Sequence, residues 1–305
     1  MHLDLYKTLA GVIVGFVIGL TGMGGGALMT PVLVLLFGVN PGTAVSADVV
    51  TSLVLKPFGG GVHVRRKTVN WRLVQWLMIG SVPSAFAGAY LLDQVIGTDN
   101  QATVKRILGW VLLVAAWAIL AKLLLQARRK EAPVTEMMDP ALVRPIPTLA
   151  VGAIGGLIVG MTSVGSGSLI IVMLMLMYPL LSSKEMVGTD LVQAIPLVAA
   201  AALGHYFFGT IDITIIGSVL LGAIPAVIVG AHFSSTGADR YIRPVLVAIL
   251  VISALGLLGV SNGWLLTVAL LATVILAVVI LRMYRAMRRD LLAEAALKPD
   301  LIGQV

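Results

Sequence analysis

One stretch of this chain occurs twice: residues 11–26 read GVIVGFVIGLTGMGGG, and residues 152–167 read GAIGGLIVGMTSVGSG. Five glycines and one threonine keep their places between the two copies. The correspondence continues downstream with a shift of one residue, pairing Asp48 with Asp190 and Gly80 with Gly222. Hydrophobic segments interrupted by glycine in matching halves indicate a transporter's substrate site. The duplication therefore predicts a membrane transporter.

The composition agrees with a membrane protein. The chain is 59% hydrophobic and 11% charged, with a mean hydropathy of +1.03, whereas soluble domains carry about 25% charged residues. The net charge of +7 comes from short basic clusters between apolar spans, which is the positive-inside pattern and not a nucleic-acid surface. There is no cysteine, and the four histidines lack metal-ligand spacing. We expect no metal, no cofactor and no nucleic-acid partner.

Spanning helices need about 20 apolar residues. Seven stretches qualify: 44–62, 72–92, 103–125, 186–208, 213–233, 241–259 and 263–281. Two longer stretches, 8–37 and 147–181, are each cut in the middle by a cluster of glycine or serine. Since three consecutive glycines weaken a helix, we predict a break in each. The predicted organisation is a first transmembrane repeat (1–125), a cytoplasmic linker (126–146), a second repeat (147–260), and an extra span with a basic tail (261–305).

Loop charges predict how the halves are oriented. The 63–72 loop is basic, but its partner, 205–213, has no lysine or arginine, so the two should face opposite sides of the membrane. Inversion requires an odd number of crossings in each half. We therefore expect an all-α integral membrane protein with two inverted repeats, each made of a Gly-broken re-entrant hairpin and three spans. Full crossing by the broken stretches stays open, but it would put the arginine-rich tail outside.

These motifs resemble the sulfite exporter TauE/SafE family. The resemblance rests on Gly15-x3-Gly19-x-Thr21-Gly22-x-Gly24-Gly25-Gly26, its copy from Gly156 to Gly167, the stretch after Asp48 and the Gly80-x2-Pro83 turn. It covers residues 8–260 and departs at Ser163 and Ser166, which replace glycines, and in the final span. The resemblance implies export of sulfur-containing anions such as sulfite or small sulfonates by a multi-pass protein of a prokaryotic inner or plasma membrane.

The broken segments are the candidate anion sites. A half-helix that begins in the membrane exposes N–H groups and a partial positive charge, which bind anions. Hydroxyl and amide groups nearby would add donors. The alternative is that the glycines serve helix packing. The candidate substrate-binding residues are Thr21, Gly24, Gly25, Gly26, Thr51, Thr162, Gly165, Ser166, Gly167, Ser168 and Gln193.

Asp48 and Asp190 are the acids at matching positions within predicted spans. Charged groups in a membrane are costly and mark ion or proton pathways, so both are candidates for coupling. The alternative is that they are helix-starting residues, which an acid in the first turn stabilises. Lys56 shares a helix face with Asp48 and is a candidate to pair with it or to meet an anion. His63 and His205 lie at predicted helix ends, where local hydrogen bonding is the ordinary role and a proton relay is the alternative.

Other functional classes fit less well. No HExxH, GxSxG or cysteine is present, so we expect no enzyme. A passive anion channel remains the alternative, since half-helix dipoles also build selectivity filters. The function predicted is secondary transport, with export of a small sulfur-containing or organic anion coupled to protons, in contact with membrane lipid. The sequence leaves the substrate and the oligomeric state open.

Overall fold

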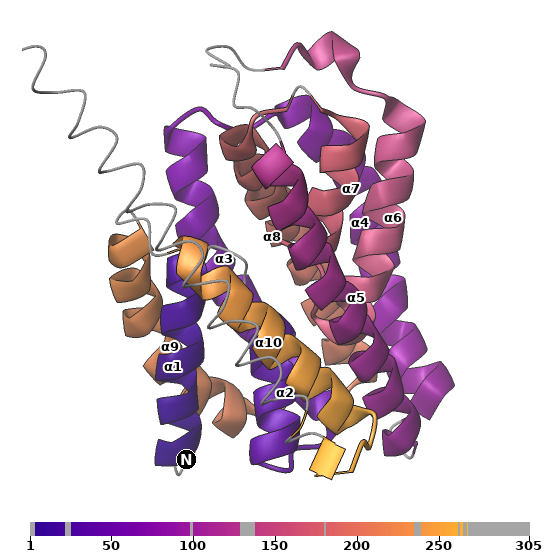
Figure 1. The fold of residues 1–305 in the computed structure, drawn as a ribbon. Coiled ribbons are helices and arrows are strands. Elements are labelled where there is room, and N and C mark those ends of the chain that lie inside the picture. Colours follow the sequence, from indigo (N-terminus) through magenta and orange to yellow (C-terminus); the bar gives the residue numbers. More distant parts are fainter. Residues whose placement is uncertain are drawn as a thin grey trace, which may run out of the picture. The chain divides into compact units, whose positions relative to one another are not determined.

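The computed structural model describes residues 4–21, 26–97, 100–128, 138–179, 181–234, 239–261, 263, 264 and 267. Their elements are all helical: α1 (Leu5–Thr21), α2 (Gly26–Leu36), α3 (Pro41–Arg65), α4 (Trp71–Tyr90), the π-helical η1 (Leu91–Gly97), α5 (Gln101–Arg128), the 3₁₀ turn η2 (Pro140–Leu142), α6 (Pro145–Thr162), α7 (Leu169–Met177), α8 (Ser183–Phe208), α9 (Ile213–Ser234) and α10 (Asp239–Leu257). Residues 1–260 form one unit and residues 261–305 a second. The packing below is that of the first unit (Figure 1).

Each predicted span within residues 44–259 has its helix, with ends that differ by a few residues. The predicted span 263–281 lies outside the described residues, apart from three positions. Four described helical segments are long and apolar enough to cross a membrane: Gln101–Lys122, Pro145–Thr162, Lys184–Phe208 and Ile213–Gly230. The predicted spans 44–62, 72–92 and 241–259 are helical but fall outside this set. In α3 the reason is its polar side chains, among them Asp48 and Lys56, which are buried inside the protein.

Both broken stretches form two helices. α6 ends at Thr162 and α7 begins at Leu169, and the turn between them uses left-handed backbone at Ser163 (φ 59°), Gly165 (φ 127°) and Gly167 (φ 91°). α7 then returns to the start of α6, because the Tyr178 hydroxyl accepts from Arg144 N at 2.9 Å and bonds the Thr148 hydroxyl at 2.6 Å. The two helices therefore form a hairpin.

The first pair of helices turns back in the same way. α1 runs parallel to α9, since Gly222 lies against Thr8 and Gly230 against Phe16. α10 follows α9 in the chain, and its Gly256 near the carboxyl end lies beside Leu35 at the end of α2. The end of α2 is thus on the side where α1 begins.

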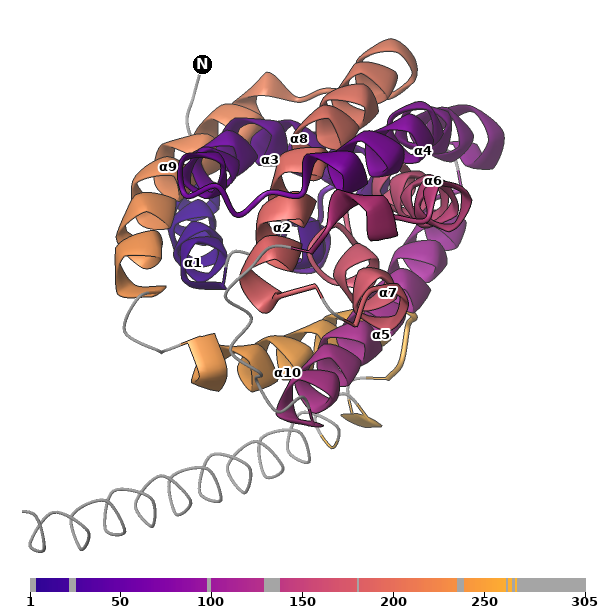
Figure 2. The ribbon, with the colours of Figure 1, turned by 90° about the horizontal axis from the view of Figure 1, so that it is seen from above.

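Glycines set the closest helix contacts. A Cβ built at Gly11 would overlap the Val219 carbonyl, and one at Gly152 would overlap the matching carbonyl of Leu77. A Cβ at Gly222 would overlap the Thr8 carbonyl oxygen. A Cβ at Gly80 would overlap the corresponding carbonyl oxygen, that of Leu149. Small residues of this kind let membrane helices approach backbone to backbone. The result is two close pairs, α1 with α9 and α4 with α6, with α3 and α8 between them (Figure 2).

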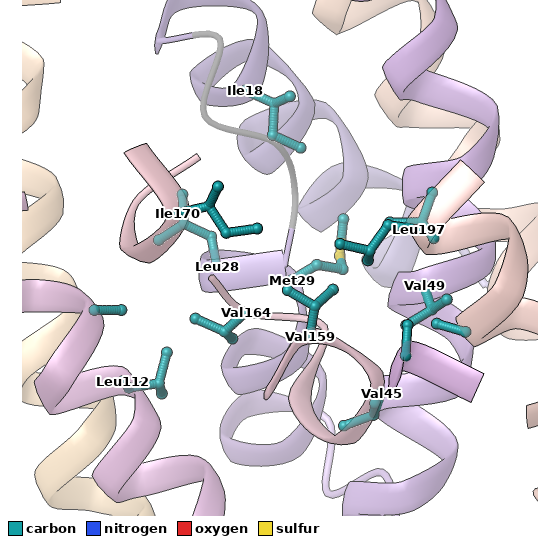
Figure 3. Packing of buried hydrophobic residues seen from close by; sticks show 14 of the residues in the cluster. Ile18, Leu28, Met29, Val45, Val49, Leu112, Val159, Val164, Ile170 and Leu197 are labelled. Atoms are coloured by element: carbon teal, nitrogen blue, oxygen red, sulfur yellow. The ribbon is translucent and has the colours of Figure 1, made fainter. Parts of the chain in front are cut away.

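The hairpins meet in the apolar core. Figure 3 shows Ile18, Leu28 and Met29 from the first broken stretch near Val159, Val164 and Ile170 from the second. Residues of α3, α5 and α8, including Val45, Leu112 and Leu197, belong to the same cluster, as do residues of α4, α9 and α10. Many large apolar side chains remain exposed, among them Trp110 (62%) and Trp117 (69%) on α5. Exposed apolar surface on this scale suits a lipid environment.

The glycine contacts predict a clear stability difference. Gly80→Ala puts a methyl group against the Leu149 carbonyl and 2.8 Å from Ala153 N, so we expect it to destabilise the protein by about 1–3 kcal/mol through overpacking. Gly61→Ala is the matched control, because no atom lies within 4 Å of the added Cβ and alanine favours a helix by about 1 kcal/mol. Thermal unfolding of the purified protein in detergent measures both. Equal midpoints for the two variants would contradict this account.

Candidate functional site

A cluster of polar side chains lies buried where α2, α3, α8 and the α6–α7 turn meet. Asp48, Lys56 and Asp190 are 0%, 7% and 2% exposed. Lys56 lies within electrostatic range of both acids and donates a hydrogen bond to the hydroxyl of Ser166. The cluster therefore joins a cation of the first half to the helix break of the second.

Asp48 has one satisfied and one unsatisfied oxygen. The hydroxyl of Thr30 on α2 donates to Asp48 Oδ2 at 2.7 Å. Ser163 lies near the same carboxylate, yet neither Ser163 Oγ nor Asp48 Oδ1 has a hydrogen-bond partner in the described part of the chain. Since a buried polar atom without a partner costs free energy, these two atoms mark a place suited to a proton, a water molecule or a polar ligand group.

Asp190 has a different set of partners. Gln193 Nε2 donates to Asp190 Oδ1 at 3.1 Å, and Ser81 Oγ on α4 donates to Gln193 Oε1 at 3.4 Å. The amide thus connects the acid to α4. Asp190 also interacts with Lys122 on α5, which is 4% exposed. The matching acids of the two halves therefore have unlike surroundings.

Neither acid occupies the start of its helix. Asn40 caps α3 by accepting from Gly42 N at 2.9 Å, and Ser182 caps α8 by accepting from Glu185 N at 3.2 Å. Asp48 and Asp190 come about two turns later, at 3.6 residues per turn. Asn40 and Ser182, and not the two aspartates, therefore cap these helices.

Some expected donors bond their own backbone instead. Thr51 Oγ1 donates to the Ala47 carbonyl at 2.8 Å, and Thr162 Oγ1 donates to that of Ile158 at 2.6 Å while accepting from Val164 N at 3.2 Å. These hydroxyls stabilise the backbone of their own helices and of the turn after α6. The Gly165 carbonyl accepts from Leu169 N at 2.9 Å, so part of the α7 amino terminus is occupied as well.

The remaining expected residues belong to the two helix breaks. Gly167 bends the turn, and Ser166 and Ser168 are buried beside it. Gly24 and Gly25 lie outside the described residues, and Thr21 and Gly26 end and begin the flanking helices. The structure thus brings together Asp48, Lys56, Ser166, Asp190 and Gln193, whereas the hydroxyl hydrogens of Thr51 and Thr162 go to backbone carbonyls.

Sequence reasoning missed three contributors to the cluster. Lys122 stands alone in an apolar run close to Arg128, so it is easily taken for a membrane-end charge. Thr30 and Ser81 have no polar counterpart in the other half, where Ile171 and Ala223 occupy their places. The signal for Lys122 was that it is the one charged residue between Arg106 and Arg128.

The histidines have contrasting environments. His63 Nδ1 bonds the Thr68 hydroxyl at 2.8 Å, which is the expected local bonding. His205 differs, because it is fully buried and contacts Asp93 and Gly160.

An apolar hollow of about 420 Å³ lies between α3, α8 and α9 and is lined by Val50, Leu53, Ala202, Leu203, Tyr206 and Ile216, among others. Its lining is almost wholly apolar. The buried polar cluster, and not this hollow, has the donors that an anion needs.

The charge arrangement predicts a non-additive pair of mutations. Lys56→Met removes a buried cation from beside two acids and should destabilise the protein by about 3 kcal/mol. Adding Asp190→Asn should recover part of that loss, because it removes one of the acids facing the missing cation. Lys67→Met, at an exposed lysine, is the control and should change stability by under about 0.5 kcal/mol. Thermal unfolding compares the natural protein, the single variants Lys56→Met and Asp190→Asn, their double variant and the control, and simple additivity of the two site substitutions would refute the interaction.

Comparison with known proteins gives the family. The family model described as "Sulfite exporter TauE/SafE" matches residues 8–257. The "Probable membrane transporter protein YjnA" of Bacillus subtilis (strain 168) is 38% identical over 252 residues, covering 82% of this chain and 98% of the relative. The "Probable membrane transporter protein YdhB" of the same organism is 25% identical over 237 residues, covering 77% and 90%. No solved structure matches the chain. The chain therefore belongs to the TauE/SafE sulfite exporter family of membrane transporters.

Proposed function

We propose that this protein is a secondary transporter that exports a small sulfur-containing or organic anion, such as sulfite or a sulfonate, in a proton-coupled reaction. The observation that carries the proposal is the buried contact of Lys56 with Ser166 in the break between α6 and α7. It brings a cation and a hydroxyl donor to a broken helix, which is the arrangement that an anion site in a membrane requires.

The proposed architecture is a pair of inverted repeats, residues 1–125 and 147–260, joined by the cytoplasmic linker 126–146. Support comes from the contacts between helices, because α1 against α9 repeats the glycine contacts of α6 against α4. α6 runs parallel to α4, and α1 runs parallel to α9. α4 also runs parallel to α8, since Ser81 bonds Gln193 and Gly204 lies against Ala89, whereas α9 turns back from α8. The two hairpins therefore start from opposite ends of the bundle. In a bilayer, each hairpin is re-entrant and its tip lies near the midplane. The amino terminus is outside, and the 66–70 turn and the tail after residue 281 are cytoplasmic.

The proposed anion site lies at the α6–α7 turn, beside the buried polar cluster. Lys56 and Ser166 supply side-chain donors, with Ser163 and Lys122 close to the acids of the same cluster. Gly165–Gly167 allow close backbone approach in the second half, and the sequence repeat gives Gly24–Gly26 as their counterparts in the first. Gln193 on α8 and Ser168 before α7 line the proposed site. Close helix packing is the role of Gly11, Gly15 and their counterparts, and it stays the alternative role for the glycines of the two breaks.

The charges give a reason for coupling. Two acids, Asp48 and Asp190, and two lysines, Lys56 and Lys122, interact in the cluster. An anion that enters such a balanced set leaves a buried net negative charge, which is costly. Proton uptake by Asp48 or Asp190 would remove that charge, so anion and proton binding support each other.

Topology is the first test of this proposal. The chain has no cysteine, so Lys67→Cys and Thr210→Cys, both at exposed positions, can be labelled one at a time in intact cells with a membrane-impermeant thiol reagent. We expect labelling at position 210 and none at position 67 until the membrane is permeabilised. Labelling of both positions from one side would overturn the inverted arrangement.

Transport is the second test. Sulfite flux into or out of liposomes is measured with and without a pH gradient, beside a direct sulfite-binding assay. Asp48→Asn and Asp190→Asn should each lower the gradient-driven flux by about tenfold, a usual size for a coupling free energy, and should affect binding less. Asp212→Asn is the matched control, because Asp212 caps α9 through Thr214 N and Ile215 N, away from the cluster.

The outcomes separate the candidate functions. An anion flux through the natural protein that does not depend on the pH gradient favours the passive anion channel. Full gradient response in both aspartate variants would remove Asp48 and Asp190 from coupling. Absence of both sulfite flux and sulfite binding would exclude sulfite as the substrate, and a sulfonate such as taurine would be tested next in the same assay.

A further inference from the structure

A second buried pair of titratable groups lies away from the proposed anion site. His205 Nδ1 is 2.7 Å from Asp93 Oδ2, and the two side chains are 0% and 1% exposed. The other ring nitrogen, His205 Nε2, is 2.9 Å from the Gly160 carbonyl oxygen. Both nitrogens of the imidazole therefore have partners.

The pair joins parts of the chain that are far apart in sequence. Asp93 lies in η1, the π-helical segment that follows α4, and His205 lies in the last turn of α8. Gly160 lies in α6, two residues before the helix ends at the hairpin turn. π-helical segments are rare and are frequent at functional sites. The contact thus ties the end of α8 to one hairpin and to the segment before α5.

The bonding atoms fix where a proton must be. A carbonyl oxygen only accepts, so Nε2 carries a hydrogen and donates it to Gly160. Nδ1 faces a carboxylate oxygen, and the two atoms bond only when one proton lies between them. That proton belongs either to an imidazolium beside a carboxylate or to a carboxylic acid beside a neutral imidazole. In both forms the pair holds one proton more than a neutral histidine beside an ionised aspartate.

Loss of that proton would break one of the two contacts. If Nε2 keeps its hydrogen for Gly160, the Nδ1 lone pair faces a carboxylate oxygen with no hydrogen between them; if the hydrogen moves to Nδ1, the Nε2 lone pair faces the Gly160 carbonyl oxygen in the same way. In either tautomer two buried acceptors face each other, which is strongly unfavourable. Separation of η1 from α8, with entry of water, relieves this arrangement.

We infer that Asp93 and His205 form a proton-binding site, distinct from Asp48 and Asp190, whose occupancy holds η1 against α8 and the α6 end of the hairpin. The ligand is a proton, and its release opens this end of the bundle. The inference goes beyond the proposed transport function and does not depend on the identity of the anion.

Apart from His205, the groups that lie against the Asp93 carboxylate are backbone glycines, and the acid nearest in sequence to Gly209, Asp212, caps α9. Gly209 after α8 lies against Asp93 Oδ2, and Gly42 at the start of α3 lies near Oδ1. Gln94, next to Asp93, donates to the Phe208 carbonyl at 3.2 Å. On α5, which packs beside η1, the nearest charged residues in sequence are Lys105 and Arg106. Within the described residues, the ion pair of Asp93 is with His205 and not with either of them.

The test uses thiol accessibility beside the pair. Leu92 is 1% exposed, and Leu92→Cys puts a single thiol next to Asp93 in a chain that has no other cysteine. Labelling rates are measured on purified protein in detergent from about pH 6 to about pH 10, a range that brackets histidine-linked events. The reference is the same cysteine combined with Asp93→Asn, because an asparagine amide donates to the neutral imidazole without a titratable proton.

Dividing the labelling rate of Leu92→Cys by that of the Leu92→Cys, Asp93→Asn double variant cancels the ionisation of the thiol itself. We expect this ratio to rise by about tenfold or more with pH, the factor that loss of a charge-assisted hydrogen bond implies. Adding Asp93→Ala instead should give fast labelling at every pH, because His205 then lacks its partner. Adding Asp212→Asn should leave the pH dependence of the natural pair unchanged.

A constant ratio across the pH range would overturn the inference and leave the pair as a static contact. If Leu92→Cys does not fold, hydrogen exchange of η1, corrected for its intrinsic pH dependence, is compared between the natural protein and Asp93→Asn with the same expected outcomes. Neither measurement uses transport, so failure of sulfite flux would count against the proposed function alone.

Discussion

The structure depends on the close approach of helix backbones at glycine. At Gly80, Gly152 and Gly222 a single Cβ would overlap a carbonyl oxygen of the neighbouring helix. In lipid there is little hydrophobic drive for helices to associate, so dispersion contacts at such small residues supply much of the attraction. These contacts cross between the halves, α1 with α9 and α4 with α6. Neither half could therefore keep its helix arrangement without the other.

The packing of the two close helix pairs against each other creates the interior in which charged side chains are buried. α3 and α8 lie between the two close pairs, and their charged residues Asp48, Lys56 and Asp190 are buried there. These three are tolerated because each has an oppositely charged neighbour and hydrogen-bond donors or acceptors close by. Each would be far more costly alone. The same constraint makes the cluster sensitive to an added anion or proton, which is the physical basis of the proposed coupling.

The two halves differ in the polar and charged side chains that they place in the protein interior. The glycine contacts match position by position, but Asp48 bonds Thr30 whereas Asp190 bonds Gln193. Lys56 matches Val198, and the Asp93–His205 pair joins residues that do not correspond in the repeat. Packing contacts need the same small residue in both copies. Proton and ligand sites need only one copy, so each half was free to acquire its own polar groups.

The membrane class, the repeat, the positions of the described spans and the two helix breaks could all be predicted from the sequence, because hydropathy and glycine clusters are local properties of the chain. Asp48, Lys56 and Asp190 could be predicted as well, since charges within apolar spans stand out. Three-dimensional packing was needed to show which glycines bring helices together, that Thr51 and Thr162 bond their own backbone, and that Lys122 and Thr30 join the cluster. It also showed that Asp93 and His205, which the sequence places at span ends, are buried together. Those outcomes depend on which helices become neighbours, and residues 112 positions apart, as Asp93 and His205 are, carry no local signal of their meeting.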